Sequence, residues 1–208
     1  MAVVLLTGFE PFDGADRNPS ADAVHAVAAG YDGPHDLIVA TLPVAFEASA
    51  HRIRALIAHH SPDVVIATGL AGGSSHVAVE RIGVNLIDAR IPDNDGAQPV
   101  DAPSEVGGPA ARFSTLPAKR LVRELAAEEL PARLSLSAGT YVCNHVLYTA
   151  LGAVRQDAVA GFVHLPWSTG TAPIGTPHLA EERLERAIRL VVDHALDTET
   201  REPGGSTW

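Results

Sequence analysis

This chain has very little cysteine: Cys143 is the only one among its 208 residues. A single cysteine cannot form a disulfide within the chain, and a working thiolate would require the reducing conditions of the cytosol. Basic residues are also few, with 15 Lys and Arg against 25 Asp and Glu and a formal net charge of −10. Nucleic acids and anionic membranes bind clustered Lys and Arg, so this charge argues against both as partners. We expect a cytoplasmic protein that acts on a small or neutral substrate.

Long apolar runs are absent as well. Val3–Leu6 and Val64–Ala67 are far shorter than the ~20 residues that cross a bilayer, and the N-terminus has no basic region that would begin an export signal. No low-complexity stretch or linker divides the chain, and 46% of its residues are apolar, which is enough for one core. We expect one domain over residues 1–197 and a flexible tail over residues 198–208.

What the sequence does contain is an alternation of apolar runs with helical patterns. Runs typical of buried strands cover Val3–Thr7, Asp36–Ala40, Asp63–Ala67 and Ala158–His164. Apolar residues recur at helical spacing in Ser20–Ala29, with Ser20 as its cap, Phe46–His59, Leu116–Leu130, Asn144–Val154 and Leu179–Leu196. This alternation predicts an α/β fold in which helices cover both faces of a central sheet.

Two further segments interrupt that alternation. Val77–Asn85 alternates with a period of two, which predicts another strand with Glu80 on the same face as Ala78. Pro92–Pro109 is a long loop rich in Asp, Gly and Pro, and its length inside one domain favours a role as a lid or a subunit contact.

Cys143 lies where a buried strand is predicted to turn directly into a helix, in the run Ala138–Tyr148. The first N–H groups of a helix have no partner within it and carry the positive end of its dipole, which stabilises a thiolate there. A lone cysteine is also often a small buried apolar residue. Taken alone, this position leaves both interpretations open.

A cysteine nucleophile needs a base, and usually a third group that orients the base. His164 is the best placed histidine because it ends an apolar strand, and sites in open α/β sheets gather at the carboxyl ends of strands. A core histidine bonded to backbone is the alternative. Glu80 on an apolar strand face needs a hydrogen-bond donor, which an imidazole or a structural arginine would supply. The sequence predicts a triad of Cys143, His164 and Glu80.

The glycine-rich turn Thr68–Ser75 offers a competing interpretation, a nucleoside- or phosphate-binding enzyme on a similar fold. The turn has neither the G-x-G-x-x-G spacing nor a Lys-Ser/Thr pair, so the signal is weak. His76 and Glu80 would ligate a metal together on a helix but not on a strand, and no clustered Cys or His spacing indicates zinc. We expect no metal site.

Several segments together resemble pyroglutamyl peptidase I, the family of pyrrolidone-carboxylate peptidases. They extend over almost the whole chain and comprise Leu6–Phe12 with Asn18–Ser20, Gly69–Asn85, Asp88–Asn94, Phe113–Pro117, Gly139–Asn144 and Gly161–Pro166. The resemblance implies a cysteine peptidase that removes an N-terminal pyroglutamyl residue from peptides. It also implies an α/β/α sandwich with a mostly parallel sheet, a cytoplasmic location, no cofactor and often a homotetramer.

The same resemblance assigns roles to individual residues. Glu80, Cys143 and His164 match the family's catalytic residues, and Arg90 would stabilise the oxyanion together with the Cys143 N–H. A structural ion pair is the rival interpretation of Arg90. The pocket for the pyroglutamyl ring, a small uncharged lactam, should have apolar walls and a few polar contacts. Its matched residues are Phe9, Phe12, Asn18, Leu70, Ile91, Tyr141 and Val142.

Some of these pocket residues have simpler explanations. Core packing is the better account of Ile91 and Val142 when each is taken singly, and Asn18 before a proline also suits a turn. Two positions depart from the family pattern, because Leu70 stands where many relatives carry Gln and Ala78 where a hydroxyl residue is usual. These departures leave open a member that binds ligand without turnover, although the intact Cys, His, Glu and Arg set argues against it.

Overall fold

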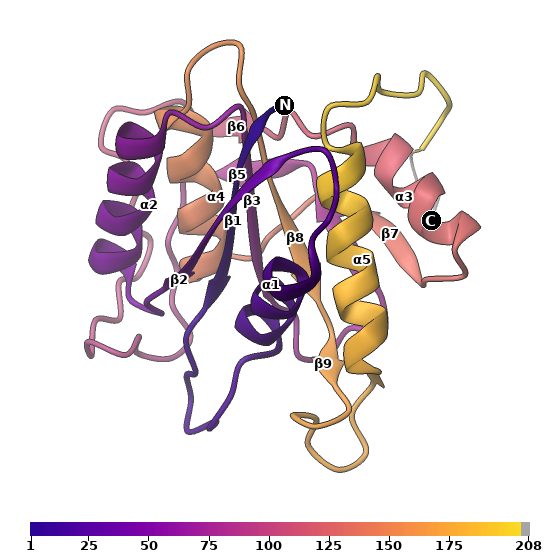
Figure 1. The fold of residues 1–208 in the computed structure, drawn as a ribbon. Helices are drawn as coiled ribbons and strands as arrows, with labels where there is room; N and C mark the ends of the chain where they lie inside the picture. Colours follow the sequence, from indigo (N-terminus) through magenta and orange to yellow (C-terminus); the bar gives the residue numbers. More distant parts are fainter. Residues whose placement is uncertain (205–208) are drawn as a thin grey trace.

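A six-stranded sheet in the order β2-β1-β3-β8-β4-β7 forms the centre of the computed structural model, which describes residues 1–204 (Figure 1). Neighbouring strands are parallel except β4 and β8, which are antiparallel. The predicted α/β fold with a mostly parallel sheet is therefore confirmed. The strands are β1 (Val3–Phe9), β2 (Asp36–Leu42), β3 (Val64–Leu70), β4 (Val77–Glu80), β7 (Ala132–Ser135) and β8 (Val159–Leu165).

Helices cover both faces of this sheet (Figure 1). One face carries α1 (Pro19–Gly30), α3 (Ala118–Ala127) and α5 (Glu181–His194), and the other carries α2 (Phe46–His60) and α4 (Val142–Ala153). Each helical layer encloses its own apolar cluster against the sheet. The central strands β1, β3 and β8 are buried on both faces, which explains their continuous apolar runs.

Alternation along β8 decides which side chains face which layer. Val163 and Leu165 pack in the α1/α3/α5 layer, whereas Phe162 packs in the α2/α4 layer, and His164 lies on the same strand face as Phe162. The opposite layer packs tightly at Gly8, where a side-chain Cβ would lie 2.6 Å from the backbone nitrogen of Ala21. Glycine at this position lets α1 lie directly against β1.

The single strand predicted over Val77–Asn85 is wrong, because the chain leaves the central sheet at Arg81. After β4 it forms β5 (Ile82–Val84), which pairs with β6 (Ala111–Phe113) in a separate antiparallel ribbon. The Arg81 N–H donates to the Ser135 carbonyl of β7, and the Arg81 carbonyl accepts from Ser114 N–H. The backbone at Arg81 thus joins the ribbon to the sheet.

Several element boundaries also differ from the predicted ones. The cap of α1 is Asn18 rather than Ser20, because the Asn18 Oδ1 accepts from the Ser20 N–H at 3.0 Å. The predicted strand before Cys143 is also wrong: β7 ends at Ser135, and a loop leads from there to α4. A two-stranded ribbon of β9 (Trp167–Ser168) and β10 (His178–Leu179) precedes α5, which therefore begins after Leu179.

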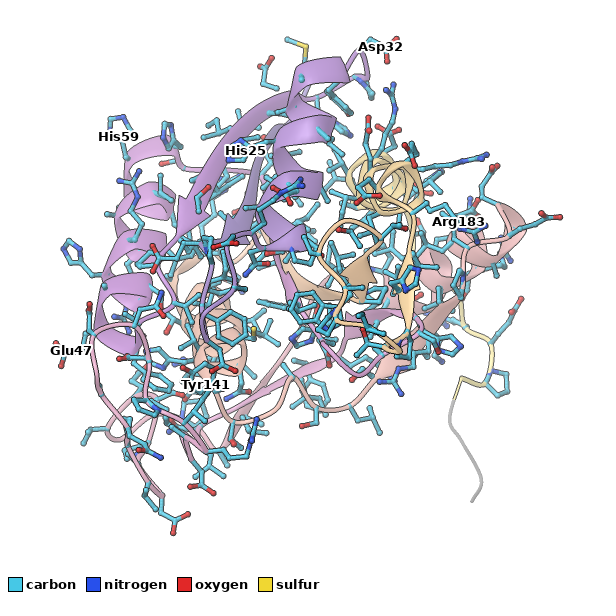
Figure 2. All side chains as sticks on the ribbon, turned by 90° about the horizontal axis from the view of Figure 1, so that it is seen from below. His25, Asp32, Glu47, His59, Tyr141 and Arg183 are labelled. Carbon is cyan, nitrogen blue, oxygen red and sulfur yellow. The ribbon has the colours of Figure 1, made fainter. Side chains whose placement is uncertain are left out.

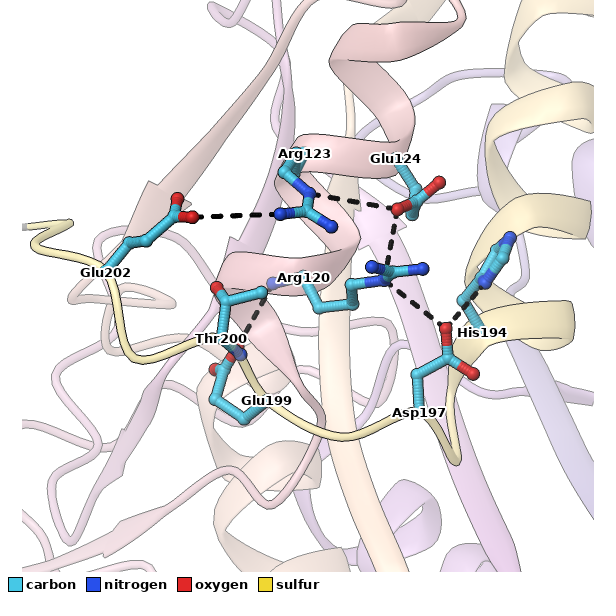
Figure 3. Close-up of polar contacts among 8 residues, drawn as sticks. All are labelled: Arg120, Arg123, Glu124, His194, Asp197, Glu199, Thr200 and Glu202. Atoms are coloured by element: carbon cyan, nitrogen blue, oxygen red, sulfur yellow. Dashed lines mark hydrogen bonds and ion pairs between the residues drawn. The ribbon is translucent and has the colours of Figure 1, made fainter.

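The segment after α5 returns to α3, as Figure 3 shows. The carboxylate of Glu199 accepts from the backbone N–H groups of Lys119 at 3.2 Å and Arg120 at 3.0 Å in the first turn of α3. Arg120 Nε lies 3.0 Å from Glu124 and 3.4 Å from Asp197. The flexibility predicted for residues 198–208 stays a prediction, and residues 205–208 lie outside the described part.

Candidate active site

Cys143 is the second residue of α4, directly after the N-cap residue Tyr141 and Val142. Its N–H belongs to the first turn of the helix, where backbone donors have no partner inside the helix. The side chain is half-buried and reaches β3, since a Cβ at Gly69 would lie only 2.8 Å from the Cys143 Sγ. The thiol thus lies at the positive end of a helix dipole. It contacts the β3 backbone at Gly69, where any side chain would occupy the space of the thiol.

His164 and Glu80 form a buried hydrogen-bonded pair beside that thiol. The antiparallel register sets Ala78 opposite His164 and Glu80 opposite Phe162, so both polar side chains lie on one face of the sheet. The Nδ1 atom of His164 lies 2.8 Å from Glu80 Oε1, and the imidazole packs against the Phe162 ring at 4.7 Å between centroids. Because Nδ1 is used by Glu80, Nε2 is the nitrogen left for the thiol.

The surroundings of His164 decide its charge. Burial by itself would lower the pKa of His164, but hydrogen bonds to Cys143 and Glu80 and their negative charge outweigh it and raise the pKa to about 9. The imidazole therefore carries a proton at neutral pH. A protonated imidazole next to a thiol favours the thiolate, which is the nucleophilic form of cysteine.

Other histidines lack this arrangement. His145, one turn into α4, is buried and meets the Phe46 ring edge-on at 6.0 Å between centroids. Burial is the main cause that lowers its pKa to about 4, so it is neutral at physiological pH. Its side chain does not line the cavity beside Cys143.

The second carboxylate oxygen of Glu80 has no hydrogen-bond partner within residues 1–204, although it is buried. Ala78 lies two residues before Glu80 on the same strand face and opposite His164, and its methyl group cannot donate a hydrogen bond. Ala78 stands where relatives usually have a hydroxyl residue. This departure thus occurs together with a buried Glu80 oxygen that has no donor among residues 1–204.

A cavity of about 160 Å³ opens beside Cys143 and His164; we call it the Cys143 cavity. It is smaller than the ~300–1,000 Å³ typical of drug-sized ligand sites, so it suits one small ring. The structure brings most of the predicted pocket residues together there, and adds Val44 and Ala138, which sequence reasoning missed. Its lining consists of Phe9, Phe12, Asn18, Val44, Leu70, Ala138, Tyr141, Val142, Cys143 and His164.

Three predicted site residues do not line this cavity: Glu80, which is bonded to His164, and Arg90 and Ile91. Arg90 is exposed, and its backbone carbonyl accepts from Gln98 Nε2 at 3.2 Å. Ile91 is half-buried in the same loop segment. Their parts in the site stay predictions.

Tyr141 forms one wall of the cavity and is fixed from two sides. Its hydroxyl donates to the Pro92 carbonyl at 2.9 Å, and its ring meets the Phe46 ring edge-on at 5.3 Å between centroids. Burial, with the nearby carboxylates Asp93 and Asp13, raises the pKa of Tyr141 to about 12, so the hydroxyl stays a neutral donor. Figure 2 looks onto this end of the sheet and shows Tyr141 among the loops that follow the strands.

Asp93 holds the long Pro92–Pro109 loop against the cavity wall, a role that sequence reasoning missed. Its buried carboxylate accepts from the Phe46 N–H at the start of α2 at 2.8 Å and from the N–H groups of Asp95 and Ala97. The next residue, Asn94, donates to the Glu10 side chain at 2.8 Å and to the Pro11 carbonyl at 3.0 Å. The loop therefore braces the segment that carries Phe12.

Asn144, beside Cys143, is a second functional residue that sequence reasoning missed. Its fully buried amide accepts from Val84 N–H and donates to the carbonyls of Val84 and Leu86, all within 3.0 Å. These bonds fix the start of α4 to the chain that leads toward Arg90. No local pattern in the sequence marks this role, because the bonded residue Val84 lies 60 positions earlier in the chain.

The glycine-rich turn does not form a phosphate loop. β3 extends through Leu70, so Gly69 belongs to a strand, and the turn that follows leads into β4 rather than into a helix N-terminus. Gly72 lies against the Trp167 indole, where a Cβ would be 3.1 Å from Nε1. Residues 1–204 also contain no group of three His, Cys, Asp or Glu side chains arranged to hold a metal, and no helix long and apolar enough to cross a membrane.

Comparison with known proteins gives a consistent result. The family model described as pyroglutamyl peptidase matches residues 2–198. A pyrrolidone-carboxylate peptidase of Clavibacter michiganensis subsp. michiganensis is 47% identical over 210 residues, covering 99% of this chain and 98% of that protein. The crystal structure of pyroglutamyl peptidase I from Bacillus amyloliquefaciens matches with a TM-score of 0.92 at 38% identity, over 98% of this chain and 99% of that one. Pyrrolidone carboxyl peptidase from Thermococcus litoralis gives a TM-score of 0.89 at 37% identity, over 95% and 94%.

Proposed function

The chain belongs to the pyroglutamyl peptidase family and is a cysteine peptidase that removes N-terminal pyroglutamyl residues, and from this premise we propose which residues carry the reaction. Cys143 is the nucleophile, His164 the general acid and base, and Glu80 the residue that orients His164. The observation that carries this proposal is the buried His164–Glu80 hydrogen bond of 2.8 Å beside a thiol at a helix N-terminus.

The first half of the reaction follows from this arrangement. The Cys143 thiolate attacks the carbonyl carbon of the pyroglutamyl residue, and a C–S bond forms. The proton held on His164 Nε2 passes to the leaving amine as the C–N bond breaks, and the amine departs as the new N-terminus of the peptide. Glu80 accepts from Nδ1–H throughout and thereby keeps the imidazole in the required tautomer.

The second half regenerates the thiolate. His164, now neutral, takes a proton from water as the water oxygen attacks the thioester carbon; the C–S bond then breaks, pyroglutamate leaves, and Cys143 and His164 return to thiolate and protonated imidazole. In both halves the oxyanion needs donors, for which we propose the Cys143 N–H and, by family resemblance, the Arg90 side chain. The position of Cys143 in the first turn of α4 supports the N–H donor.

Specificity for the pyroglutamyl ring is proposed to come from the Cys143 cavity. Phe9, Phe12, Tyr141 and Val142 supply apolar walls for the lactam ring, while its few polar atoms meet Asn18 and the backbone at Leu70. No Asp or Glu side chain is part of the described lining. A free N-terminal amine would lose water there without gaining a counter-charge, so unmodified N-termini are rejected. Ile91 is retained as a more distant wall residue by family resemblance alone.

We also propose that the protein acts in the cytoplasm without a cofactor and forms a homotetramer. A reducing compartment keeps Cys143 as a thiol, which supports the location. Exposed apolar side chains support self-association: Phe113 is 66% exposed, and Leu136 is 61% exposed.

The proposal is tested by hydrolysis of a fluorogenic pyroglutamyl amide next to its prolyl and glutamyl counterparts, under reducing conditions. We expect release from the pyroglutamyl amide alone, and loss of nearly all activity in Cys143→Ala, because no other thiol exists in the chain. His51→Ala, which removes an exposed histidine on α2, is the matched control. Turnover in Cys143→Ala, or ligand binding without turnover in the unsubstituted protein, would contradict the assignment.

A further inference from the structure

A second cavity, of about 390 Å³, adjoins the Cys143 cavity and has no part in the mechanism above. Residues 12–15, residues 171–173 and Trp167 line it, and we call it the Trp167 cavity. Phe12 lines both cavities, so they adjoin at this residue. Both cavities lie beyond the carboxyl ends of β1 and β8.

Trp167 holds a fixed position in the lining of the Trp167 cavity. It lies in β9, three residues after His164, and its backbone pairs with His178 of β10. Its half-buried indole rests on the glycine-rich turn, where a Cβ at Gly72 would come within 3.1 Å of Nε1. Below it, Thr169 N–H donates to the Leu179 carbonyl at 3.0 Å and closes the base of the loop. Backbone pairing thus fixes the side of the cavity that carries Trp167.

The chemistry of the lining is aromatic and acidic. Phe12 and Trp167 present ring surfaces, and Asp13 is the charged residue among the described lining residues. Asp13 is exposed and adopts a positive φ of 53°, an uncommon conformation that Asp tolerates better than most residues. Aromatic faces attract cations, and the Asp13 carboxylate adds an opposite charge at the rim.

The reaction itself defines what must lie next to the Cys143 cavity. A space of about 160 Å³ accommodates the pyroglutamyl ring but not the peptide attached to it. His164 must reach the nitrogen of the scissile bond, so the peptide beyond that nitrogen leaves the thiol on the side of His164. The strand that carries His164 ends at Leu165, and Trp167 follows two residues later as the first residue of β9.

From these observations we infer that the Trp167 cavity receives a side chain of the departing peptide and prefers Lys or Arg there over Asp or Glu. The aliphatic stem of a basic side chain would lie between Phe12 and Trp167, with its charged end toward Asp13. This inference rests on the proposed function and adds to it a specificity that lies outside the pyroglutamyl pocket.

The test compares pyroglutamyl peptides that carry one Lys or one Glu at the first, second or third position after the ring, with pyroglutamyl amide as a minimal substrate. We expect the unsubstituted protein to favour Lys over Glu at one of these positions by about tenfold in kcat/KM. Asp13→Asn should bring this ratio close to one. Trp167→Ala should lower kcat/KM for the preferred Lys peptide about tenfold more than for pyroglutamyl amide, and Trp167→Phe should restore most of that loss.

The matched control is Ile174→Ala, in the same loop but with a fully exposed side chain outside the cavity, which should leave the ratio unchanged. Equal cleavage of the Lys and Glu peptides by a protein that hydrolyses pyroglutamyl amide would overturn the inference and leave the proposed function intact. Equal losses on peptide and amide in Trp167→Ala would overturn it too. Failure of the unsubstituted protein to cleave any of these substrates would overturn both.

Discussion

His164 is bonded through Nδ1 to Glu80 and faces the Cys143 thiol, and these two partners keep it protonated well above the ordinary range of a histidine. Its pKa of about 9 in the folded protein compares with an ordinary value of 6.5. A raised pKa means that the charged imidazole stabilises the folded state. This contribution is complete below pH 6.5 and is lost as the pH rises through about 9.

The dependence of kcat/KM on pH should follow the protonation of His164. We expect kcat/KM to fall above about pH 9 as His164 loses the proton that the leaving amine needs. In Glu80→Gln the neutral amide no longer favours the imidazolium. The alkaline decline of kcat/KM should therefore move to lower pH, and the maximum value of kcat/KM should fall at least ~100-fold. Steady-state kinetics between pH 5 and 11 checks this, with Glu47→Gln on exposed α2 surface as control. An alkaline limb at the same pH in Glu80→Gln would refute the proposed role of the pair.

Single residues also show which parts of the site could be predicted from the sequence. The close grouping of Cys143, His164 and Glu80 could be predicted because a thiol nucleophile needs a base and an orienting acid, and each stood in a distinctive local pattern; their catalytic roles stay predictions. Asp93 and Asn144 could not, because their task is to bond the backbone of segments far away in the chain, such as Phe46 and Val84. Local patterns do not reveal which distant carbonyl or N–H a side chain will meet.

At the scale of elements, α3 depends on a carboxylate from another part of the chain. Its N-cap residue is Pro117, whose side chain makes no capping bond, and Glu199 accepts from the first-turn N–H groups of Lys119 and Arg120 instead; Figure 3 shows the bond to Arg120. Replacing Glu199 with Ala should lower the free energy of unfolding by about 1 kcal/mol, the usual effect of losing a helix cap.

Thermal and urea denaturation of this variant provide the measurement. Glu202→Ala is the matched control, since it removes only an exposed ion pair of 3.7 Å with Arg123, and exposed pairs contribute little. A Glu199→Ala protein as stable as the control would show that the cap contributes nothing in solution.

The helices and strands also show which parts of the fold could not be predicted from the sequence. The buried strands β1, β3 and β8 were predictable from their continuous apolar runs, and helices α1 to α5 from their spacing. The division of Val77–Asn85 into β4 and β5 was not, because the alternation continues through Arg81 while the backbone there turns to bond Ser135 and Ser114. A hydrophobic pattern records which face is buried but not which sheet buries it.

For the whole molecule, exposed apolar side chains near the edge strand β7 bear on the proposed assembly. Leu136 follows β7, and Phe113 lies in β6, on either side of the Arg81 backbone that joins sheet and ribbon. If copies associate through this surface, Leu136→Lys should shift the protein to smaller species, because burying a charge at an apolar interface is costly.

Light scattering after size-exclusion chromatography measures this mass directly. Ile174→Lys, which places the same charge on a fully exposed side chain in the loop between β9 and β10, is the control. Equal masses for Leu136→Lys and the unsubstituted protein would exclude this surface as the interface.

The order of strands in the sheet has a consequence for folding during synthesis. β3 and β4 follow each other in the chain, yet β8 lies between them in the sheet. During synthesis, β3 therefore presents an open edge until residues 159–165 emerge from the ribosome, long after β1, β2 and β3 have been made. The same late insertion brings His164 to Glu80. The open edge of β3 and the unpaired Glu80 thus persist over the same interval of synthesis, and both end when β8 enters the sheet.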